Sequence, residues 1–545
     1  MPDPLFTDIH CHPELKTFLS ANDEQNRLDC WHNISLSHLL EIIDRILLGD
    51  ILGSQSSLSQ LNNVSGTIAL PGLYALEKAM INGDFINILG FSANLKTIAC
   101  RLQQTFNNDM IDCDLLERIS SPQSSYYRLF KETQTHLLNS ITINPGYNLI
   151  NNIGEYDPGM LNIIFNIEGG HNLFDSTSDS SRYGDVLSHL SDLKREHRYL
   201  YIGLAHVERN PLCTHAYGMK ILHHNDFKPV GCGITPLGKE VIIEALNQPN
   251  RILIDIKHMS LEARRQYYEI LETDYGSERI PILISHSGLT GVSWDNKPVA
   301  CRKKDHGWIK VRYFKPEGLM GTKFNPWSIN LYDEEIIKIV ASDGLIGLNL
   351  DERILGAKQK RRAERVEYFS PEEFNRSDFR LQFFRSIFAM DWDEAPSQEE
   401  LNSSEIRIQV IEILRDIIMN PDILNDLEGL TRRIDDLYTN LQSIPVLLSE
   451  KGIKHLCNNI LHIVQVAGNN GWRHISIGSD FDGLINPVDS CRDATEYESL
   501  AQKLETKLQE MAETIPGFPT MSHIDQKVHD IMSGNAYRFL QTYFN

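Results

Sequence analysis

The stretches "RILIDIKH" (251–258) and "IPILISH" (280–286) each join a nearly continuous apolar run to a histidine at its carboxyl end. Runs of this length and character are typical of parallel strands that are covered on both faces. Further runs of the same kind, each ending in His, Glu or Asp, are "LFTDIH" (5–10), "LNIIFNIE" (161–168), "RYLYIGLAH" (198–206), "DGLIGLNLD" (343–351) and "RHISIGSD" (473–480). With "DFINILG" (84–90) as a weaker candidate, the sequence predicts eight strands.

Helical stretches such as 235–248 and 449–470 separate these runs. The alternation predicts a parallel α/β fold. A closed (β/α)8 TIM barrel explains the sequence better than an open sheet, because polar residues stand at the carboxyl ends of many different strands. An open doubly wound sheet concentrates its chemistry at one switch point instead.

The chain is longer than a minimal barrel, and we interpret residues 1–545 as a single barrel with additions at three places. Residues 20–150 form a largely helical N-terminal elaboration in this interpretation. Residues 288–330 are a basic and aromatic insertion after the sixth strand, which could form a lid. Residues 352–448 have the charge and periodicity of a helical insertion after the seventh strand.

The bulk properties exclude several classes of protein. A net charge of −21 argues against a nucleic-acid partner, which would need a basic face. The chain has no apolar run of about eighteen residues, so we expect no membrane span. The cysteines number nine, without a CxxC pair, which predicts reduced thiols. Together with the lack of a visible leader segment, this pattern predicts a cytoplasmic protein.

Two histidines one residue apart, His10 and His12, stand at the end of the first predicted strand. Alternate residues of a strand share one face, so both imidazoles could bind one metal ion. Such a pair alone is more often a surface feature. Here, however, other strands end in similar side chains, and burying them together would be costly unless they were paired or metal-bound. The sequence therefore predicts a metal centre with the ligands His10, His12, Glu168, His258, His286 and Asp480.

This ligand set is too large for one catalytic zinc ion, which typically has about three protein ligands and an open position. We therefore expect two divalent metal ions, with the carboxylate of Glu168 as the bridge between them. Zinc is the expected metal, with Mn, Fe or Ni as the alternatives.

Longer motifs extend this pattern: "IEGGH" (167–171), "GLAH" (203–206), "GITPLGKEVI" (233–242), "LIDIKHMS" (253–260), "PILISHSG" (281–288), "HISIGSDFDG" (474–483) and "MSGNAYRFL" (532–540). In content and order they resemble the membrane (renal-type) dipeptidase family, peptidase M19, within the metal-dependent amidohydrolase superfamily. "EGGH" and "GSDFDG" together are specific, whereas "TDIHCH" alone would also suit TatD-type or PHP-type hydrolases. The resemblance spans the barrel but not most of 20–150, 288–325 or 352–448.

The resemblance implies a role for each residue of the centre. Glu168 would bridge two zinc ions, with His258 and His286 completing one site. His10, the second histidine of the pair and Asp480 would complete the other site. His12 is a departure, because the dipeptidases usually carry Asp at its position.

The resemblance also implies a mechanism, in which a hydroxide shared by the two metals attacks the amide carbonyl. Asp480 would take the proton and later return it to the leaving amine. His206 matches the histidine that contacts the substrate carbonyl and stabilises the oxyanion.

A second departure concerns substrate binding. In the dipeptidases an arginine after the "SHS" strand binds the substrate carboxylate, but the best-matching segment here, "NPWSINLYDEE" (325–335), contains no arginine. Arg302, Arg312 and Lys323 of the insertion are the candidate replacements, although charged residues of such a loop are more often solvated.

The sequence thus predicts a metal-dependent hydrolase of the dipeptidase type, acting on a dipeptide or another small molecule. Hydrolysis of a lactone, an ester or an N-acyl amide at the same site is the first alternative. A binding protein that has lost activity is the second. The resemblance further implies a homodimer.

Overall fold

The computed structural model describes the greater part of the chain. The described residues are 3–20, 28–36, 44, 52–85, 94–106, 111–144, 146–178, 185–220, 222–357, 366–376, 412, 429, 432, 449–515 and 523–545.

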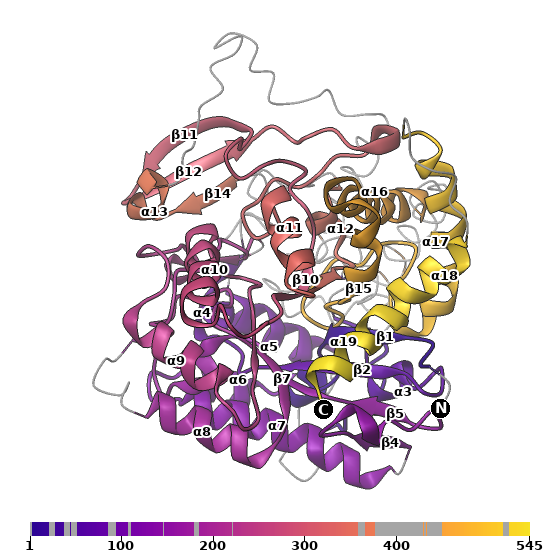
Figure 1. Ribbon diagram of the computed structural model, residues 1–545. Helices are drawn as coiled ribbons and strands as arrows, with labels where there is room; N and C mark the ends of the chain where they lie inside the picture. Colours follow the sequence, from indigo (N-terminus) through magenta and orange to yellow (C-terminus); the bar gives the residue numbers. More distant parts are fainter. Residues whose placement is uncertain are drawn as a thin grey trace.

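The described residues place a closed barrel of parallel strands at the centre of the molecule, and helices surround it (Figure 1). Strand β1 (Thr7–Cys11) pairs with β2 (Ile68–Leu73) on one side and with β15 (Ile475–Ile477) on the other, which closes the sheet. The strands follow one another around the barrel in chain order: β1, β2, β6 (Phe165–Ile167), β7 (Tyr199–Gly203), β9 (Leu253–Asp255), β10 (Leu283–Ser287), β13 (Leu345–Leu348) and β15. The predicted (β/α)8 fold is confirmed.

The second barrel strand is the one that the sequence placed wrongly. Residues 84–85 of "DFINILG" form the short strand β3 (Asp84–Phe85), which pairs antiparallel with β8 (Leu222–His223) outside the barrel; the remainder, 86–90, lies outside the described residues. The barrel uses β2, "IALPGL", instead. Pro71 and Gly72 disfavour a strand in the sequence pattern. Gly72 is required by close packing, because a Cβ there would lie 2.4 Å from Cε1 of His10.

Helices follow the barrel strands and begin at recognisable capping residues. The side chain of Thr235 accepts a hydrogen bond from the backbone N–H of Gly238, and Ser260 does the same for Ala263. The helices that lie between or after barrel strands are α7 (Tyr126–Ile143), α8 (Val186–Glu196), α9 (Pro236–Leu246), α10 (Leu261–Asp274), α11 (Asp333–Ala341), α16 (Ser449–Ala467), α17 (Tyr497–Ala512), α18 (Ile524–His529) and α19 (Asn535–Tyr543).

Two of these helices are joined by a fully buried ion pair. Arg264 of α10 donates from Nε and Nη2 to the two carboxylate oxygens of Glu335 of α11, at 2.6 and 2.8 Å. The same guanidinium donates to the carbonyls of Met259 and Ser328, at 3.0 and 2.8 Å. This pair therefore fixes α10 and α11 to the end of the 288–330 insertion.

The described part of 20–150 is mainly helical, but it also contributes the barrel strand β2. Its other elements are α3 (Leu58–Leu61), α4 (Lys78–Asn82), α5 (Leu95–Phe106), α6 (Cys113–Ser120), α7 and the short strand β4 (Tyr147–Leu149), which extends the sheet through β5 (Leu161–Ile163). The short helix α1 (Leu15–Phe18) precedes this region.

The two later insertions meet in a small antiparallel sheet. Strands β11 (Val299–Asp305) and β12 (Trp308–Tyr313) form a hairpin, and β12 also pairs with β14 (Val366–Phe369). Figure 1 shows this sheet beside α13 (Pro371–Arg376), apart from the barrel strands. The 352–448 insertion therefore begins with the helix α12 (Glu352–Leu355) and then a strand, whereas the sequence predicted helix; most of the remainder lies outside the described residues.

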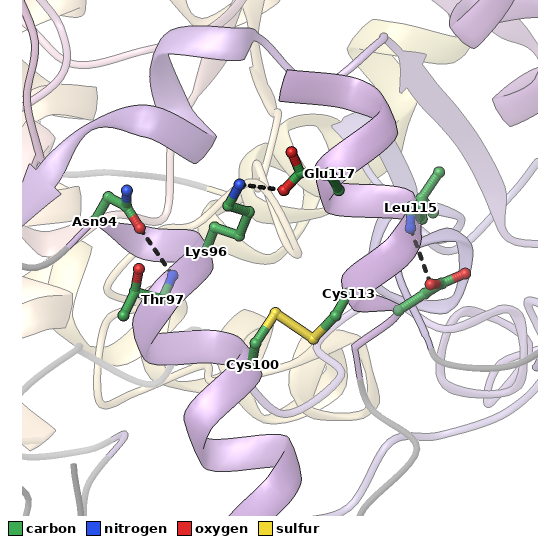
Figure 2. Close-up of a disulfide and its surroundings, with 8 residues drawn as sticks. Asn94, Lys96, Thr97, Cys100, Cys113, Leu115 and Glu117 are labelled. Carbon is green, nitrogen blue, oxygen red and sulfur yellow. Dashed lines mark hydrogen bonds and ion pairs between the residues drawn. A yellow bond between two sulfur atoms is a disulfide. The ribbon is translucent and has the colours of Figure 1, made fainter. Parts of the chain in front are cut away.

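A disulfide between Cys100 and Cys113 links α5 to α6 (Figure 2). The prediction of reduced thiols is wrong for this pair. Scattered cysteines in a sequence do not show which Cα atoms come together, and here they lie 5.8 Å apart, within the range that a disulfide spans. The free cysteines among the described residues are Cys11, Cys30, Cys213, Cys232, Cys457 and Cys491. Within the described segments, no helix combines the length and apolar character needed to cross a membrane.

Candidate metal centre

The structure brings all six predicted ligands together at the carboxyl ends of the barrel strands. They come from five different strands: His10 and His12 from β1, Glu168 from β6, His258 from β9, His286 from β10 and Asp480 from β15. All are buried except Asp480, whose side chain is 14% exposed.

Glu168 is the hub of the cluster. Its Oε1 lies 3.3 Å from Nε2 of His10, 3.3 Å from Nε2 of His258 and 3.6 Å from Nε2 of His286. Its Oε2 lies 3.4 Å from Nε2 of His12. Asp480 approaches from the other side, with Oδ1 3.4 Å from Nε2 of His12 and Oδ2 3.8 Å from Nε2 of His286. Imidazoles from opposite sides of the barrel therefore converge on one carboxylate.

The cluster fits divalent cations. Among the described residues, Nε2 of His10, His12 and His258 is buried without a hydrogen-bond partner. These nitrogens lie 3.3–3.4 Å from Glu168 oxygens, and a cation between them could form bonds of about 2.0–2.2 Å to each.

The ligand atoms divide into two compact groups that share Glu168. One group is His10, His12 and Glu168, and the other is Glu168, His258 and His286; within each group the atoms lie within 4.8 Å of one another. A third group of the same compactness, His10, His286 and Asp480, connects the two. A shared carboxylate with two imidazoles on each side is an arrangement that holds a pair of cations.

Hydrogen bonds to Nδ1 fix the orientation of two of the imidazoles. The hydroxyl of Tyr201 donates to the carbonyl of Ile9 at 2.8 Å, so it accepts from Nδ1 of His10, also at 2.8 Å. Ser285 donates to Asp255 at 2.6 Å and accepts from Nδ1 of His286 at 2.8 Å. In both rings the proton is held on Nδ1, which leaves the Nε2 lone pair facing the cluster.

The local electrostatics favour the metal-binding forms of these groups. Burial lowers the pKa of His258 and of His286 well below the usual value, which keeps both imidazoles neutral. Burial alone would raise the pKa of Glu168, but the surrounding imidazoles, His206 and His10 foremost, lower it well below the usual value. For His12, burial lowers the pKa, yet Glu168 and Asp480 outweigh it and raise the pKa to about 9. A proton and a cation therefore compete for His12, and binding of a cation releases that proton.

Two residues of the cluster adopt a backbone conformation that side chains rarely take. His258 and Asp480 both have a φ of 64°, in the left-handed region. Each such residue costs on the order of 1–3 kcal/mol, and the surrounding structure must maintain it. The strain turns the chain sharply after β9 and β15, so that His258 faces Glu168 and Asp480 faces the imidazoles of His12 and His286.

His206, the predicted substrate-contacting histidine, lies beside the cluster, with Nε2 3.6 Å from Oε1 of Glu168. Its Nδ1 is hydrogen-bonded to the buried carboxylate of Glu77. The sequence analysis missed Glu77, because it follows β2, the strand that was not recognised. Burial lowers the pKa of His206, but Glu77 and Glu168 outweigh it and raise the pKa to about 9.

Two further neighbours of the centre were also missed. Asn349, at the end of β13, donates to Oδ2 of Asp480 at 3.0 Å. Lys257 is buried, lines the cavity beside the cluster and directly precedes His258. Both residues stand at the carboxyl ends of predicted strands, but Asn and Lys are not among the His, Glu and Asp side chains from which the metal centre was predicted.

None of the predicted carboxylate-binding residues, Arg302, Arg312 and Lys323, lines the cavity at the metal centre. Arg302, on β11, lies over the ring of Phe374, 5.5 Å from its centroid. Lys323 pairs with Glu317 at 3.4 Å. Arg312 lies on β12 within the small antiparallel sheet. The hairpin that carries Arg302 and Arg312 pairs with β14, and these side chains stay outside the cavity lining. The arginine that does line the cavity is Arg353, which is paired with Asp351.

A sequence model described as "Membrane dipeptidase (Peptidase family M19)" matches residues 322–518. No curated protein matches the chain. Among solved structures, a probable dipeptidase, PvdM, from Pseudomonas aeruginosa has 16% sequence identity and a TM-score of 0.48, over 92% of this chain and 97% of that one. A metallopeptidase from Rhodobacter sphaeroides, bound to a phosphinate mimic of the dipeptide L-Ala-D-Ala, has 12% identity and a TM-score of 0.45, over 99% and 100%. Sequence identities and TM-scores this low show only that the chain is similar to these two structures.

The barrel and the sequence match together define the class of protein, a metal-dependent hydrolase with its site at the carboxyl ends of the strands. Residues 322–518 of this chain are similar to the membrane dipeptidase family, M19. The resemblance predicted from the sequence motifs is confirmed.

Proposed function

We propose that this chain hydrolyses the amide bond of a dipeptide or a dipeptide-like substrate at a centre of two divalent cations. The observation that carries the proposal is the sharing of Glu168 between the pair His10 and His12 and the pair His258 and His286. When bound, the two cations would activate water at neutral pH and polarise the scissile carbonyl.

Asp480 is the proposed acid–base residue. Its carboxylate lies against both imidazole pairs, and Asn349 fixes Oδ2 through a hydrogen bond of 3.0 Å. At 14%, its side chain is the most exposed of these six described ligands, so it can meet the substrate. We assign it removal of the proton from the attacking water and delivery of that proton to the leaving amine.

His206 is the proposed donor to the developing oxyanion. Glu77 accepts the hydrogen bond from Nδ1, and Glu77 and Glu168 together raise the pKa of the ring to about 9, which favours the form in which Nε2 also carries a hydrogen. That nitrogen faces the cluster, and His206 lines the cavity. A fixed donor of this kind stabilises the transition state more than the ground state.

The donor set supports zinc as the resident metal. Four imidazoles and two carboxylates suit zinc, and Fe or Ni would also accept a site rich in imidazole, with Mn as the harder alternative. Having imidazole at His12, in place of the family's usual carboxylate, removes one negative charge from its site. We therefore expect weaker binding of cations at that site than at the one formed by His258 and His286.

Metal analysis and a substrate panel test the proposal together. The purified protein, stripped with a chelator and reloaded with zinc or manganese, should hold two equivalents; His258→Ala should hold one. The matched control is His306→Ala, since His306 is 92% exposed. Less than one equivalent in the reloaded wild-type protein would overturn the metal proposal.

The panel contains L-Ala-L-Ala, L-Ala-D-Ala, an N-acyl amino acid, an ester and a lactone. We expect metal-dependent cleavage of at least one dipeptide, abolished in Asp480→Asn. Cleavage of only the ester or lactone would instead support the first alternative. Full metal occupancy with no turnover of any compound would support the inactive binding protein.

The cytoplasmic location and the homodimer also belong to this proposal. The free cysteines support a reducing compartment, whereas the Cys100–Cys113 disulfide is typical of an oxidising one. Cell fractionation with trapping of free thiols, and sedimentation of the purified protein, test the two predictions directly.

A further inference from the structure

The cavity at the metal centre is far more apolar than cleavage of a small dipeptide requires. It has a volume of about 230 Å³ and reaches from His12, His206 and Asp480 into a region lined by leucine, isoleucine and methionine side chains. A cavity of about 150 Å³ with such a lining holds a benzene molecule, so this space takes a larger apolar group.

The N-terminal elaboration builds one wall of this cavity. Met80 of α4, Leu95 and Ala99 of α5, and Leu116 of α6 all line it. The disulfide shown in Figure 2 joins α5 to α6, so the two helices of this wall are covalently held together. The elaboration thus supplies apolar surface next to the reacting centre.

Further parts of the lining come from segments far away in sequence. Met219 lies in the loop after β7, Trp327 in the 288–330 insertion, Ile354 in α12, and Leu484 after Asp480. Several separate additions to the barrel therefore converge on one apolar space, which indicates that the space has a purpose beyond packing.

Three basic side chains that line the cavity away from the metal cluster are engaged with the protein. Lys16 pairs with Asp482 at 2.6 Å, and Arg353 pairs with Asp351. Lys220 donates to the carbonyl of Val366 at 2.8 Å. A ligand that extends from the metal centre into this region therefore meets apolar surface, and its transfer from water would be favourable.

We propose that the substrate carries a long apolar chain, of about six or more carbons, attached to the amide that is cleaved. This inference rests on the proposed amide hydrolysis and specifies its substrate class. The chain occupies the space lined by residues of α4, α5 and α6 together with Met219, Trp327 and Ile354. Because this binding energy is available before and during the reaction, chain length should act mainly through KM.

A series of dipeptides that differ only in chain length tests the inference. The variable residue is Ala, norleucine, 2-aminooctanoic acid or 2-aminodecanoic acid, placed either first or second in a dipeptide with Ala. We expect kcat/KM to rise about fourfold per methylene at one of the two positions until the cavity is filled. Equal kcat/KM for Ala-Ala and every longer substrate at both positions would overturn the inference, while leaving amide hydrolysis established.

Two variants locate the effect. Ala99→Phe fills the cavity from α5, and Leu95→Gln makes the same wall polar; neither residue belongs to the catalytic machinery. Both should lower kcat/KM for the 2-aminodecanoyl substrate at least tenfold and leave that for Ala-Ala within about twofold. Ile337→Gln, at an apolar residue of α11 that is 52% exposed, is the matched control and should change neither value. An unchanged length dependence in both cavity variants would refute this placement of the chain.

Binding without turnover separates this inference from the proposed function. Calorimetric titration of the protein with free 2-aminodecanoic acid should show a negative heat-capacity change that is absent for alanine. If no dipeptide is cleaved but this signature is found and is lost in Ala99→Phe, amide hydrolysis fails and the apolar site stands. If dipeptides are cleaved and the signature is absent, the apolar site fails.

Discussion

The hydroxyl of Tyr201 lies 2.8 Å from Nδ1 of His10 and donates its own proton to the carbonyl of Ile9, also at 2.8 Å. Tyr201 is on β7 and His10 is on β1, so the contact crosses the interior of the barrel. One phenol therefore determines which nitrogen of His10 is presented to Glu168. A residue that never touches a cation can in this way control the affinity of the centre.

Replacing this phenol should weaken metal binding without removing a ligand. Tyr201→Phe lets the imidazole of His10 rotate and change tautomer, so we expect zinc affinity to fall about 10- to 100-fold. Competition with a chromophoric chelator measures this directly. Tyr127→Phe, at a half-buried tyrosine stacked on His189, is the control. Equal affinities of Tyr201→Phe and wild type, with an unchanged melting temperature, would contradict the role of the phenol.

The contact between Glu77 and His206 predicts a change in the pH profile. Loss of the carboxylate in Glu77→Gln lowers the pKa of His206 from about 9, so the protonated donor is lost at a lower pH. We expect the basic limb of the kcat/KM profile to move to lower pH and activity at pH 8 to fall about 100-fold. Glu117→Gln, at a carboxylate 72% exposed, should leave the profile unchanged. A profile in Glu77→Gln that matches wild type would remove His206 from its proposed role.

The buried pair of Arg264 and Glu335 makes a prediction about stability. In Arg264→Leu the carboxylate of Glu335 stays buried without its partner, which should lower the free energy of unfolding by about 3–5 kcal/mol. The double variant Arg264→Leu/Glu335→Leu should recover most of that loss, because two apolar side chains replace two charges. Urea denaturation measures both variants. A double variant no more stable than the single one would show that the pair does not act as a unit.

Glu208 should make stability depend on pH. Burial, followed by the nearby charge of Glu77, raises the pKa of Glu208 to about 8, whereas an exposed glutamate has a pKa near 4.5. Between these values the folded chain keeps a proton that the unfolded chain releases, so stability falls as pH rises across this window. Glu208→Gln stays neutral and still accepts from Ala79. Relative to wild type, it should gain about 4–5 kcal/mol at pH 8.5 and about 1 kcal/mol at pH 5, as measured by chemical denaturation.

The disulfide predicts the number of reactive thiols. Of the nine cysteines, two are bonded to each other, so a denatured, non-reduced sample should react with at most seven equivalents of a thiol reagent. Cys100→Ser and Cys113→Ser should each lower the free energy of unfolding by up to about 3 kcal/mol, from the loss of a short closed loop. Cys232→Ser, at a free and partly exposed cysteine, is the control. Nine titratable thiols would show that the pair is reduced.

Seven of the eight barrel strands and the six residues of the candidate metal centre, Glu168 included, could be placed from the sequence. Parallel barrel strands are apolar on both faces, and their carboxyl ends meet at one mouth, so an apolar run that ends in His, Glu or Asp signals position and chemistry together. Strand β2 was not predicted, because its sequence satisfies a tertiary contact and not a strand pattern: Gly72 leaves room for the ring of His10. The strand propensity of a short segment contains no information about contacts with residues that are far apart in sequence.

Glu77 and Tyr201 were missed for related reasons. Glu77 acts on the centre through His206, and Tyr201 acts through His10, so neither belongs to a ligand pattern. The pairing of β12 with β14 depends on residues more than fifty positions apart, and it moved Arg312 away from the site that the sequence predicted for it. The apolar cavity likewise arises only when α4, α5 and α6 pack beside the barrel mouth.

The closure of the barrel by β1 and β15 has a consequence for how the centre forms. Backbone hydrogen bonds of 2.9 Å join Asp480 to His10 and His12 to Phe481, across more than 460 residues. Closing so long a loop is slow, so we expect the pairing of β1 with β15 to form late in folding. Metal uptake at His10, His12 and Asp480 therefore reports when the first and last strands meet during refolding. The rate at which zinc becomes protected from a chelator should equal the rate of the slowest folding phase.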